Sequence, residues 1–151
     1  MSMYLIDGNN LIGHSREISY HDPQARQKLL ERVIPFLDQG GSKAVIFFDG
    51  GSQSLRKSKN IEIVFSGPKS SADEKIRQFV ESSSLPKSLC VVTSDNSVYG
   101  YCRSCGARAM KCHEFNRLLR ERQRAQIGKE DRDIRIDNLR QWLRYFGEEE
   151  D

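Results

Sequence analysis

The sequence lacks any long hydrophobic run, and this absence excludes several classes of protein. Hydrophobic residues make up 37% of the 151, and no stretch approaches the roughly 20 apolar residues of a membrane-spanning helix. The N-terminal residues reach Asp7 without the basic flank and apolar centre of a signal peptide, which favours a cytoplasmic protein with no membrane partner. Internal repeats, low-complexity linkers and a glycine-rich P-loop are also missing. We therefore expect one domain over residues 1–147, with a basic helical part near its C-terminal end, and an acidic tail over 148–151.

Cysteine is scarce, and all four cysteines fall within one short segment. Clustering of this kind favours reduced thiols over a set of structural disulfides. Cys102 and Cys105 are two residues apart and precede Cys112 and His113, so zinc binding is one interpretation. The spacing fits only in part, because a structural zinc site usually joins two knuckles on separate turns. A redox pair is a second interpretation, and buried or incidental thiols are the one that we favour.

Short apolar runs alternate with segments of helical periodicity along the chain. The runs predict strands at residues 3–6, 44–48, 61–65, 89–93 and 107–110, and the direction of the third of these is not set by the pattern. The periodic segments predict helices at residues 22–40, 71–84, 96–105, 113–127 and 139–146. A polar stretch over residues 13–21 predicts a loop, whose histidines we interpret as surface residues. Such alternation predicts an α/β fold with an open, mostly parallel sheet.

Three of the expected strands end in an aspartate. Asp7, Asp49 and Asp95 follow the apolar runs, and Asp73 lies in the first turn of an expected helix. Each has an ordinary explanation, because turns and helix N-termini favour aspartate. Ligands of open parallel sheets bind at the carboxyl ends of the strands, so we expect these acids to meet at one edge. Convergent carboxylates repel one another, which indicates a divalent cation, Mg²⁺ or Mn²⁺, of the kind that assists phosphodiester hydrolysis.

Several short motifs occur along the chain in an order that resembles a known family. The motifs are residues 6–12, 45–49, 61–66 followed by Ala72 and Asp73, 91–95, and 106–108. Together they resemble the YacP-like branch of the NYN family, which belongs to the PIN-like nucleases, and the similarity extends from Tyr4 to Arg124. The resemblance implies a PIN-like three-layer sandwich, with a mostly parallel central sheet flanked by helices, and metal-dependent cleavage of RNA.

The resemblance also implies roles for individual residues. Asn10 matches an asparagine that would orient the first acid or the scissile phosphate. Thr93 and Ser94 match a polar pair that would support the acid of the fourth strand or contact a phosphate. The implied catalytic and metal-binding residues are Asp7, Asp73 and Asp95, with Asp49 either as a further metal ligand or as a cap of the glycine turn that follows it.

Basic residues are concentrated between residues 103 and 124, where few acids offset them. Arginine-rich surface helices also occur in proteins that bind nothing charged, so this composition alone does not identify a polyanion as the partner. Beside a nuclease site, the same residues would contact the phosphate backbone without reading its sequence. The candidate substrate-binding cations are Arg103, Arg108, Arg117, Arg120 and Arg124, together with Arg56 and Lys57 from the loop after Asp49.

These observations predict a Mg²⁺- or Mn²⁺-dependent endoribonuclease that hydrolyses single-stranded RNA. Its partner would be mRNA, rRNA or tRNA, free or on the ribosome. One alternative is a non-catalytic RNA-binding or ribosome-associated module of the same fold, in which only the basic surface functions. A second alternative is a phosphatase or nucleotide hydrolase, although the sequence lacks the P-loop that many such enzymes use.

Overall fold

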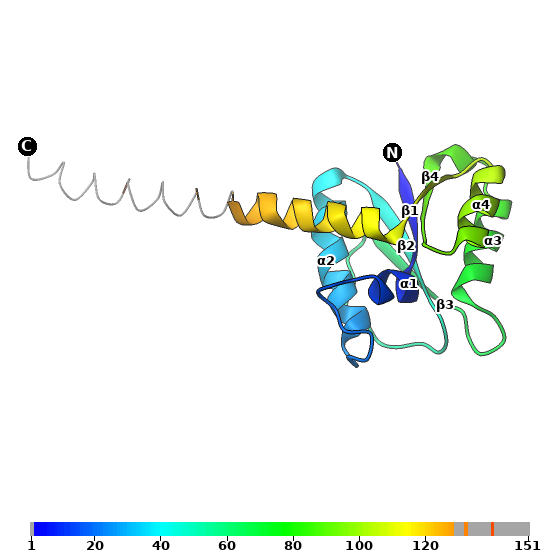
Figure 1. Ribbon diagram of the computed structural model, residues 1–151, viewed down its shortest axis with the longest axis horizontal. Coiled ribbons are helices and arrows are strands. Elements are labelled where there is room, and N and C mark those ends of the chain that lie inside the picture. The colour runs from blue at the N-terminus through cyan, green and yellow to red at the C-terminus, as the bar shows by residue number, and fades with distance from the viewer. Residues whose placement is uncertain (1, 129–131, 133–139, 141–151) are drawn as a thin grey trace, which may run out of the picture. The chain divides into compact units, whose positions relative to one another are not determined.

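A sheet of five parallel strands forms the centre of the structure, which is a computed structural model that describes residues 2–128, 132 and 140 (Figure 1). The strands are β1 (Met3–Asp7), β2 (Lys43–Phe48), β3 (Ile61–Phe65), β4 (Leu89–Val92) and β5 (Arg108–Met110). They lie in the order β3-β2-β1-β4-β5, and each neighbouring pair is parallel. The predicted parallel α/β sheet is therefore confirmed, and the third strand runs in the same direction as the others.

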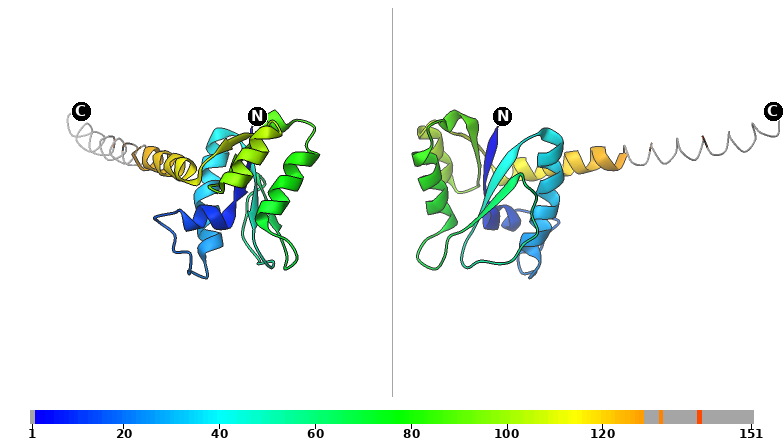
Figure 2. Two further views of the ribbon diagram at one scale, coloured as in Figure 1. Left: turned by 45° about the vertical axis from the view of Figure 1, so that its right-hand side comes forward. Right: turned by 180° about the vertical axis from the view of Figure 1, so that it is seen from behind.

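Helices cover both faces of the sheet and give the three layers of the fold (Figures 1 and 2). On one face lie α1 (Gly8–Gly13), α2 (Ala25–Gly40) and the start of a helix that begins at residue 112, packed with Ile6 of β1. On the other face lie α3 (Ala72–Ser82) and α4 (Asn96–Ser104), packed with Leu5 of the same strand. Both side chains are fully buried, because apolar helices cover the central strand on its two sides.

The order of the strands reverses beside β1. The chain first adds β2 and β3 on one side of β1, and after α3 it adds β4 and β5 on the other side. A short 3-10 helix, η1 (Pro86–Ser88), leads into β4. In open parallel sheets, ligands bind at the carboxyl ends of the strands where such a reversal occurs. The topology therefore points to the turns that follow β1 and β4 as the place for a functional site.

The chain divides into two compact units, Met1–Leu119 and Arg120–Asp151. The first unit contains the whole sheet and α1 to α4. Residues 112–128 are helical, as the periodicity from His113 predicted. The expected helix over 139–146, the acidic tail over 148–151 and the predicted domain boundary at residue 147 lie outside the described residues. None of the helices within the described part of the chain is long and apolar enough to span a membrane.

The N-terminal part of the fold differs from the sequence prediction in two places. Residues 8–13, expected to form a turn and the beginning of a loop, form α1 instead. The second helix begins at Ala25 and not at Asp22, because the carboxylate of Asp22 accepts the N–H of Gln24 in a turn that precedes the helix. Pro35 lies inside α2 without ending it, and the helix stops before Gly41, whose φ is 66°.

Close packing of α1 against β2 explains the glycine at position 8. A Cβ atom there would lie 2.4 Å from Cε1 of Phe48, which is fully buried, and 3.0 Å from the carbonyl oxygen of Phe47. We expect Gly8→Ala to lower the free energy of unfolding by about 1–3 kcal/mol through overpacking, measured by chemical denaturation.

Gly100→Ala is the matched control for Gly8→Ala. Gly100 lies in α4, and no atom of a neighbouring element lies within 4 Å of an added Cβ in the part of the chain that the structure describes. The control should be neutral or more stable by up to about 1 kcal/mol, because alanine favours helix. Equal destabilisation by the two substitutions would contradict close packing as the reason for Gly8.

Candidate functional site

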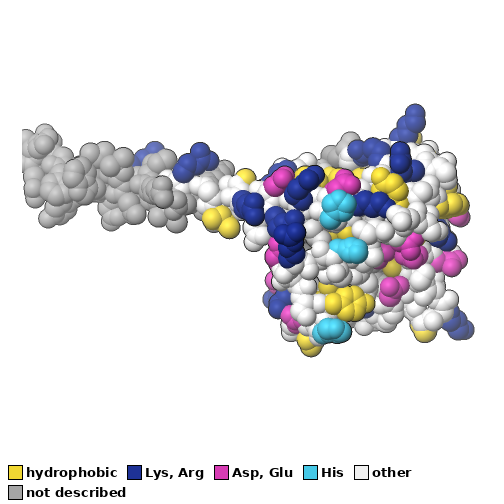
Figure 3. Space-filling view, in the orientation of Figure 1, with side chains coloured by type: hydrophobic (Ala, Val, Ile, Leu, Met, Phe, Trp, Pro, Cys, Tyr) yellow, Lys and Arg dark blue, Asp and Glu magenta, His cyan; other side chains and the backbone are white. Residues whose placement is uncertain are grey.

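Four aspartates line one cavity of about 350 Å³ at the carboxyl edge of the sheet. Asp7 ends β1, Asp49 follows β2, and Asp95 follows β4. Asp73 comes from the first turn of α3. The structure thus brings together all four acids that the sequence singled out, and acidic side chains gather on one part of the face shown in Figure 3. The remaining lining residues are Asn9, Asn10, Gly13, His14 and Tyr20.

Asp7 is the buried acid of the cavity, with only 4% of its surface exposed. Burial is the largest of the effects that raise the pKa of Asp7 to about 7. A hydrogen bond with Asp73 and the negative charges of Asp73 and Asp49 act in the same direction, and the N–H of Asn10 partly offsets them. Near neutral pH, Asp7 can therefore keep a proton and donate it to Asp73 in this hydrogen bond.

Asp49 and Asp95 reach the cavity while each also holds the N-terminus of a helix. Asp95 is the N-cap of α4, and its Oδ1 accepts the N–H of Val98 at 3.0 Å. Asp49 Oδ1 accepts the N–H of Ala72, the first residue of α3, at 2.7 Å. In the glycine turn that follows Asp49, the N–H of Gly50 binds the hydroxyl of Ser66 after β3, and the carboxylate of Asp49 binds the start of α3 instead. Each carboxylate has two oxygens, so a cap leaves lone pairs for a second partner.

Two adjacent asparagines of α1 join the strand ends around the cavity. Asn9 Oδ1 accepts the N–H of Asp49 at 2.9 Å and ties α1 to the end of β2. Asn10 Oδ1 accepts the N–H of Ser94 at 2.7 Å and ties α1 to the end of β4. Only the backbone N–H of Asn10 contacts Asp7, at 3.4 Å, so its side chain positions the neighbouring strand. Sequence reasoning missed Asn9, although two adjacent asparagines one residue beyond the first acid were an available signal.

Thr93 and Ser94 support the turn after β4. Thr93 is fully buried, and its Oγ1 accepts the N–H of Asp95 at 3.2 Å. Of the two roles implied for Thr93, the structure therefore agrees with support of Asp95, and its burial argues against a direct contact with a substrate phosphate. Ser94 is partly exposed, and its Oγ accepts the N–H of Cys112 at 3.1 Å. A phosphate contact by Ser94 stays a prediction.

The zinc interpretation of the cysteines is wrong. Cys102 lies in the core on the α3 and α4 face, and Cys112 lies in the core on the α1 and α2 face, so the sheet separates them. Both side chains are fully buried, and burial raises the pKa of each thiol to about 11, which disfavours the thiolate form that zinc binds. Cys105 and the other cysteines are free thiols. Cys112 donates instead to Asn10 Oδ1 at 3.1 Å, behind the acidic cavity.

The donors of the cavity suit a hard divalent cation that retains several waters. They are carboxylate and amide oxygens, which Mg²⁺ and Mn²⁺ prefer. Within the described residues, no three His, Cys, Asp or Glu side chains are gathered tightly enough to form a closed metal cage. Mg²⁺ does not need one, because it is often held by one or two carboxylates with water in its other positions. Asp7 and Asp73, which are in contact, would hold such an ion, with Asp49 and Asp95 beside it.

Four of the predicted substrate-binding cations lie away from the acidic cavity. Arg108 begins β5 and donates to Ser2 Oγ at 2.7 Å, so it lies at the amino edge of the sheet. Arg103 is in the last turn of α4, which runs from the carboxyl edge towards that same edge. Arg56 and Lys57 form ion pairs with glutamates of α2 and β3, and neither lines the cavity. Arg103 and Arg108 therefore do not flank the acids, because the spacing of residues does not show at which end of an element they lie. A contact of Arg56 or Lys57 with RNA stays a prediction.

The other three predicted cations lie on the helical residues 112–128. Arg117 belongs to the first unit, and Arg120 and Arg124 belong to the second. Arg124 is exposed. A role for these arginines in contacting RNA stays a prediction.

Comparison with known proteins agrees with the fold. Two similar solved structures are crystal structures of Rae1 (YacP) from Bacillus subtilis and of a tryptophan-to-leucine mutant of that protein. The first has a TM-score of 0.77 at 22% identity and covers 91% of this chain and 84% of its own. The second has a TM-score of 0.70 at 23% identity and covers 91% of this chain and 85% of its own.

A comparison with curated proteins gives no match. A family model does match, and it describes the YacP-like NYN domain over residues 4–144. The solved structures are 22% and 23% identical to this chain and support its fold alone. The family model covers most of the chain. The chain therefore belongs to the YacP-like NYN domain family, whose members are nuclease-like RNA-processing domains.

Proposed function

We propose that this protein is an endoribonuclease that cleaves single-stranded RNA with Mg²⁺ or Mn²⁺ bound in the acidic cavity. The observation that carries the proposal is the contact of Asp73 with the buried carboxyl group of Asp7, whose pKa is raised to about 7. Two acids held together without a cation destabilise the ionised form, and a divalent ion would remove this repulsion. Membership of a family of nuclease-like RNA-processing domains supports RNA as the substrate.

The residues that line the cavity would have different roles in the reaction. When bound, a divalent ion supplies charge stabilisation on a phosphate oxygen and lowers the pKa of a water. Asp7 would lose its proton to water when an ion is bound, because a nearby cation lowers the pKa of a carboxyl group. Asp95 is held by its helix cap and by Thr93, and it would orient water at the cavity wall. Asn9 and Asn10 would keep the strand ends at a fixed spacing.

A second candidate is a non-catalytic RNA-binding module of the same fold, on the ribosome or on free RNA. The open arrangement of the acids favours it, because no closed cage of three ligands exists among the described residues. Cleavage and binding must therefore be measured separately. RNA that is bound tightly but never cleaved, with either ion present, would support this second candidate and contradict the endoribonuclease.

The first test is cleavage of labelled single-stranded RNA in Mg²⁺, in Mn²⁺ and in chelator. We expect cleavage only with metal, and a loss of at least about 100-fold in Asp7→Asn and in Asp73→Asn, since even outer-shell partners of metal ligands contribute roughly 10–100-fold. Glu74→Gln is the matched control, because Glu74 neighbours Asp73 in the first turn of α3 but does not line the cavity. Cleavage in chelator, or full activity in both aspartate variants, would contradict the proposal.

The second test uses stability and does not depend on activity. The pKa of Asp7 is raised from 3.8 to about 7 in the folded state, so the folded protein binds more protons than the unfolded chain between these values. In chelator, the free energy of unfolding should therefore fall as the pH rises from about 4 to 7, by up to ~4 kcal/mol at 1.36 kcal/mol per pH unit. The asparagine of Asp7→Asn cannot titrate, so the free energy of unfolding of this variant should fall less over the same pH range. Urea denaturation at several pH values measures the difference.

Metal provides the complementary measurement in the same experiment. At pH 8, Mg²⁺ or Mn²⁺ should raise the melting temperature of the wild type in a concentration-dependent manner, because the folded state alone has the site. The melting temperature of Asp7→Asn should respond much less. Parallel pH profiles for the two proteins, or equal stabilisation of both by metal, would argue against Asp7 as a buried metal ligand.

A third test concerns the arginines of the C-terminal unit. Charge reversal at Arg120 and Arg124 together should weaken RNA binding and reduce the slope of log K against log salt by about 1.4, since each phosphate contact to a single strand contributes about 0.7. The control is charge reversal at Lys43 and Lys87, which lie at the amino ends of β2 and β4. An unchanged salt slope in the arginine variant, measured by fluorescence anisotropy, would remove these residues from the RNA-binding surface.

A further inference from the structure

A second, smaller cavity adjoins the acidic one. It has a volume of about 210 Å³ and shares Asn9 and Tyr20 with the acidic cavity. Tyr20 is 56% exposed, so its ring contributes little to the core and stands where the two cavities meet. The other lining residues are Ile12, Asp22, Pro23, Ala25, Arg26 and Gln53. An exposed aromatic ring at this position offers a flat face to whatever enters the acidic cavity.

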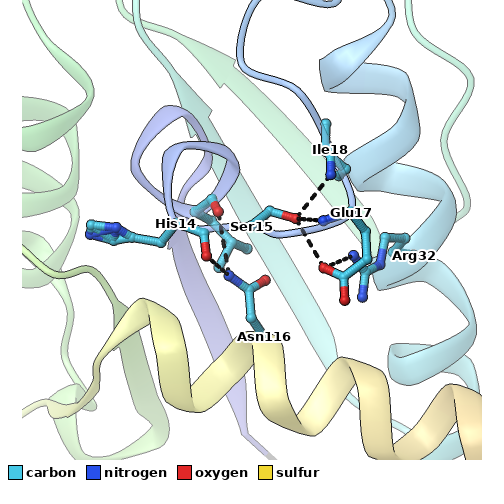
Figure 4. A network of polar contacts seen from close by, with 7 residues as sticks. His14, Ser15, Glu17, Ile18, Arg32 and Asn116 are labelled. Carbon is cyan, nitrogen blue, oxygen red and sulfur yellow. Dashed lines mark hydrogen bonds and ion pairs between the residues drawn. The ribbon is translucent and has the colours of Figure 1, made fainter.

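The loop segment that leads to Tyr20 is anchored to two helices (Figure 4). Ser15 Oγ accepts the N–H groups of Glu17 and of the next residue, each at 3.2 Å, which closes a turn. The carboxylate of Glu17 pairs with Arg32 of α2 at 2.9 Å. Asn116 Nδ2 donates to the carbonyl oxygen of His14 at 3.2 Å. These contacts hold the loop before any ligand arrives, which lowers the entropy lost when a ligand binds.

The size of the second cavity favours a small flat group. Ligand pockets for drug-sized molecules usually measure about 300–1,000 Å³, and this cavity is smaller. It also combines apolar walls with amide and guanidinium groups, from Asn9, Gln53 and Arg26. A nucleobase has this combination of a flat apolar face and a hydrogen-bonding edge.

The charges of the second cavity argue against a phosphate as its occupant. Lys28 and the N–H of Gln24 hold the pKa of Asp22 below its usual value, so Asp22 remains an anion in the cavity wall. Arg26 donates to the carbonyl oxygens of Asp49 at 2.7 Å and of Gly51 at 3.2 Å, which directs its guanidinium towards backbone oxygens. A neutral group therefore fits this cavity better than an anion does.

We propose that this cavity binds one nucleobase of the RNA strand that occupies the acidic cavity, with the base stacked on the ring of Tyr20. The inference rests on the proposed function, because it takes RNA as the ligand. It adds a binding residue, Tyr20, in a loop that the sequence predicts only as a polar connection. Stacking on an aromatic ring accepts every base, so this subsite fixes the strand and does not select a sequence.

The test measures binding of a short labelled single-stranded RNA in chelator, where no metal-dependent cleavage takes place, by fluorescence anisotropy. Tyr20→Leu should weaken binding by about 5- to 100-fold, the range expected for loss of one base–aromatic stack. Tyr20→Phe keeps the ring and should bind as the wild type does. Tyr101→Leu is the matched control, because Tyr101 is also exposed, at 39%, and lines neither cavity. Unchanged melting temperatures in all three variants establish that the fold is intact.

A second arm places a single abasic nucleotide at each position of the RNA in turn. The wild type should lose affinity strongly at one position, and Tyr20→Leu should lose no further affinity there. Wild-type affinity in Tyr20→Leu, or an equal loss in Tyr20→Phe and Tyr20→Leu, would overturn the subsite.

Failure of the subsite and failure of the proposed function give different results. Metal-dependent cleavage with RNA binding that does not depend on Tyr20 would overturn the subsite alone. Binding that depends on Tyr20, without cleavage in either metal, would retain the subsite and overturn the endoribonuclease. A wild-type protein that binds no RNA would overturn both.

Discussion

The contact between the buried carboxyl group of Asp7 and the carboxyl group of Asp73 is the interaction on which the rest of the site depends. A carboxylate that is 4% exposed at the end of the central strand is unfavourable, and a second acid beside it increases the repulsion. The acids stay together because the fold fixes both of them. Asp7 belongs to the central strand, and Asp73 lies in the first turn of α3, whose first residue is bound by Asp49. A proton or a cation relieves the repulsion, so occupancy of the cavity and stability of the fold are thermodynamically linked.

The acids at the strand ends have structural roles and line the site at the same time. Asp95 caps α4 and Asp49 binds the start of α3, yet both line the cavity that contains Asp7. The ordinary explanation of each aspartate, as a cap or a turn residue, is therefore correct without excluding a functional one. A helix N-terminus interacts favourably with the carboxylate that caps it, which holds these two side chains in place. The structural role thus provides the rigidity that a metal site needs.

The pattern of the sequence was sufficient to predict the sheet and the four aspartates at its edge, because buried strands and the turns after them have strong local signals. It was insufficient wherever a contact joins distant elements. In the sequence, Thr93 is a polar residue two positions before Asp95, and only the packed structure shows that it is fully buried. In the sequence, Arg108 belongs to a basic cluster, but the parallel direction of β5 places it at the amino edge of the sheet, away from the acids. Asn9 and Tyr20 carry no periodic signal, since their importance comes from what the fold places beside them.

An acidic cavity repels the phosphates of the polymer that it is proposed to cleave, so affinity must come from other parts of the molecule. The arginines at the amino edge of the sheet lie at the wrong end to provide it. Two candidate sources are the arginines of the C-terminal unit and a neutral contact such as stacking on Tyr20. They differ in their response to salt, because phosphate contacts release counterions, whereas a stacked base does not. A stacking contact beside the cavity would hold the strand at ionic strengths where the arginine contacts are weak, which would separate the positioning of the scissile phosphate from the overall affinity for RNA.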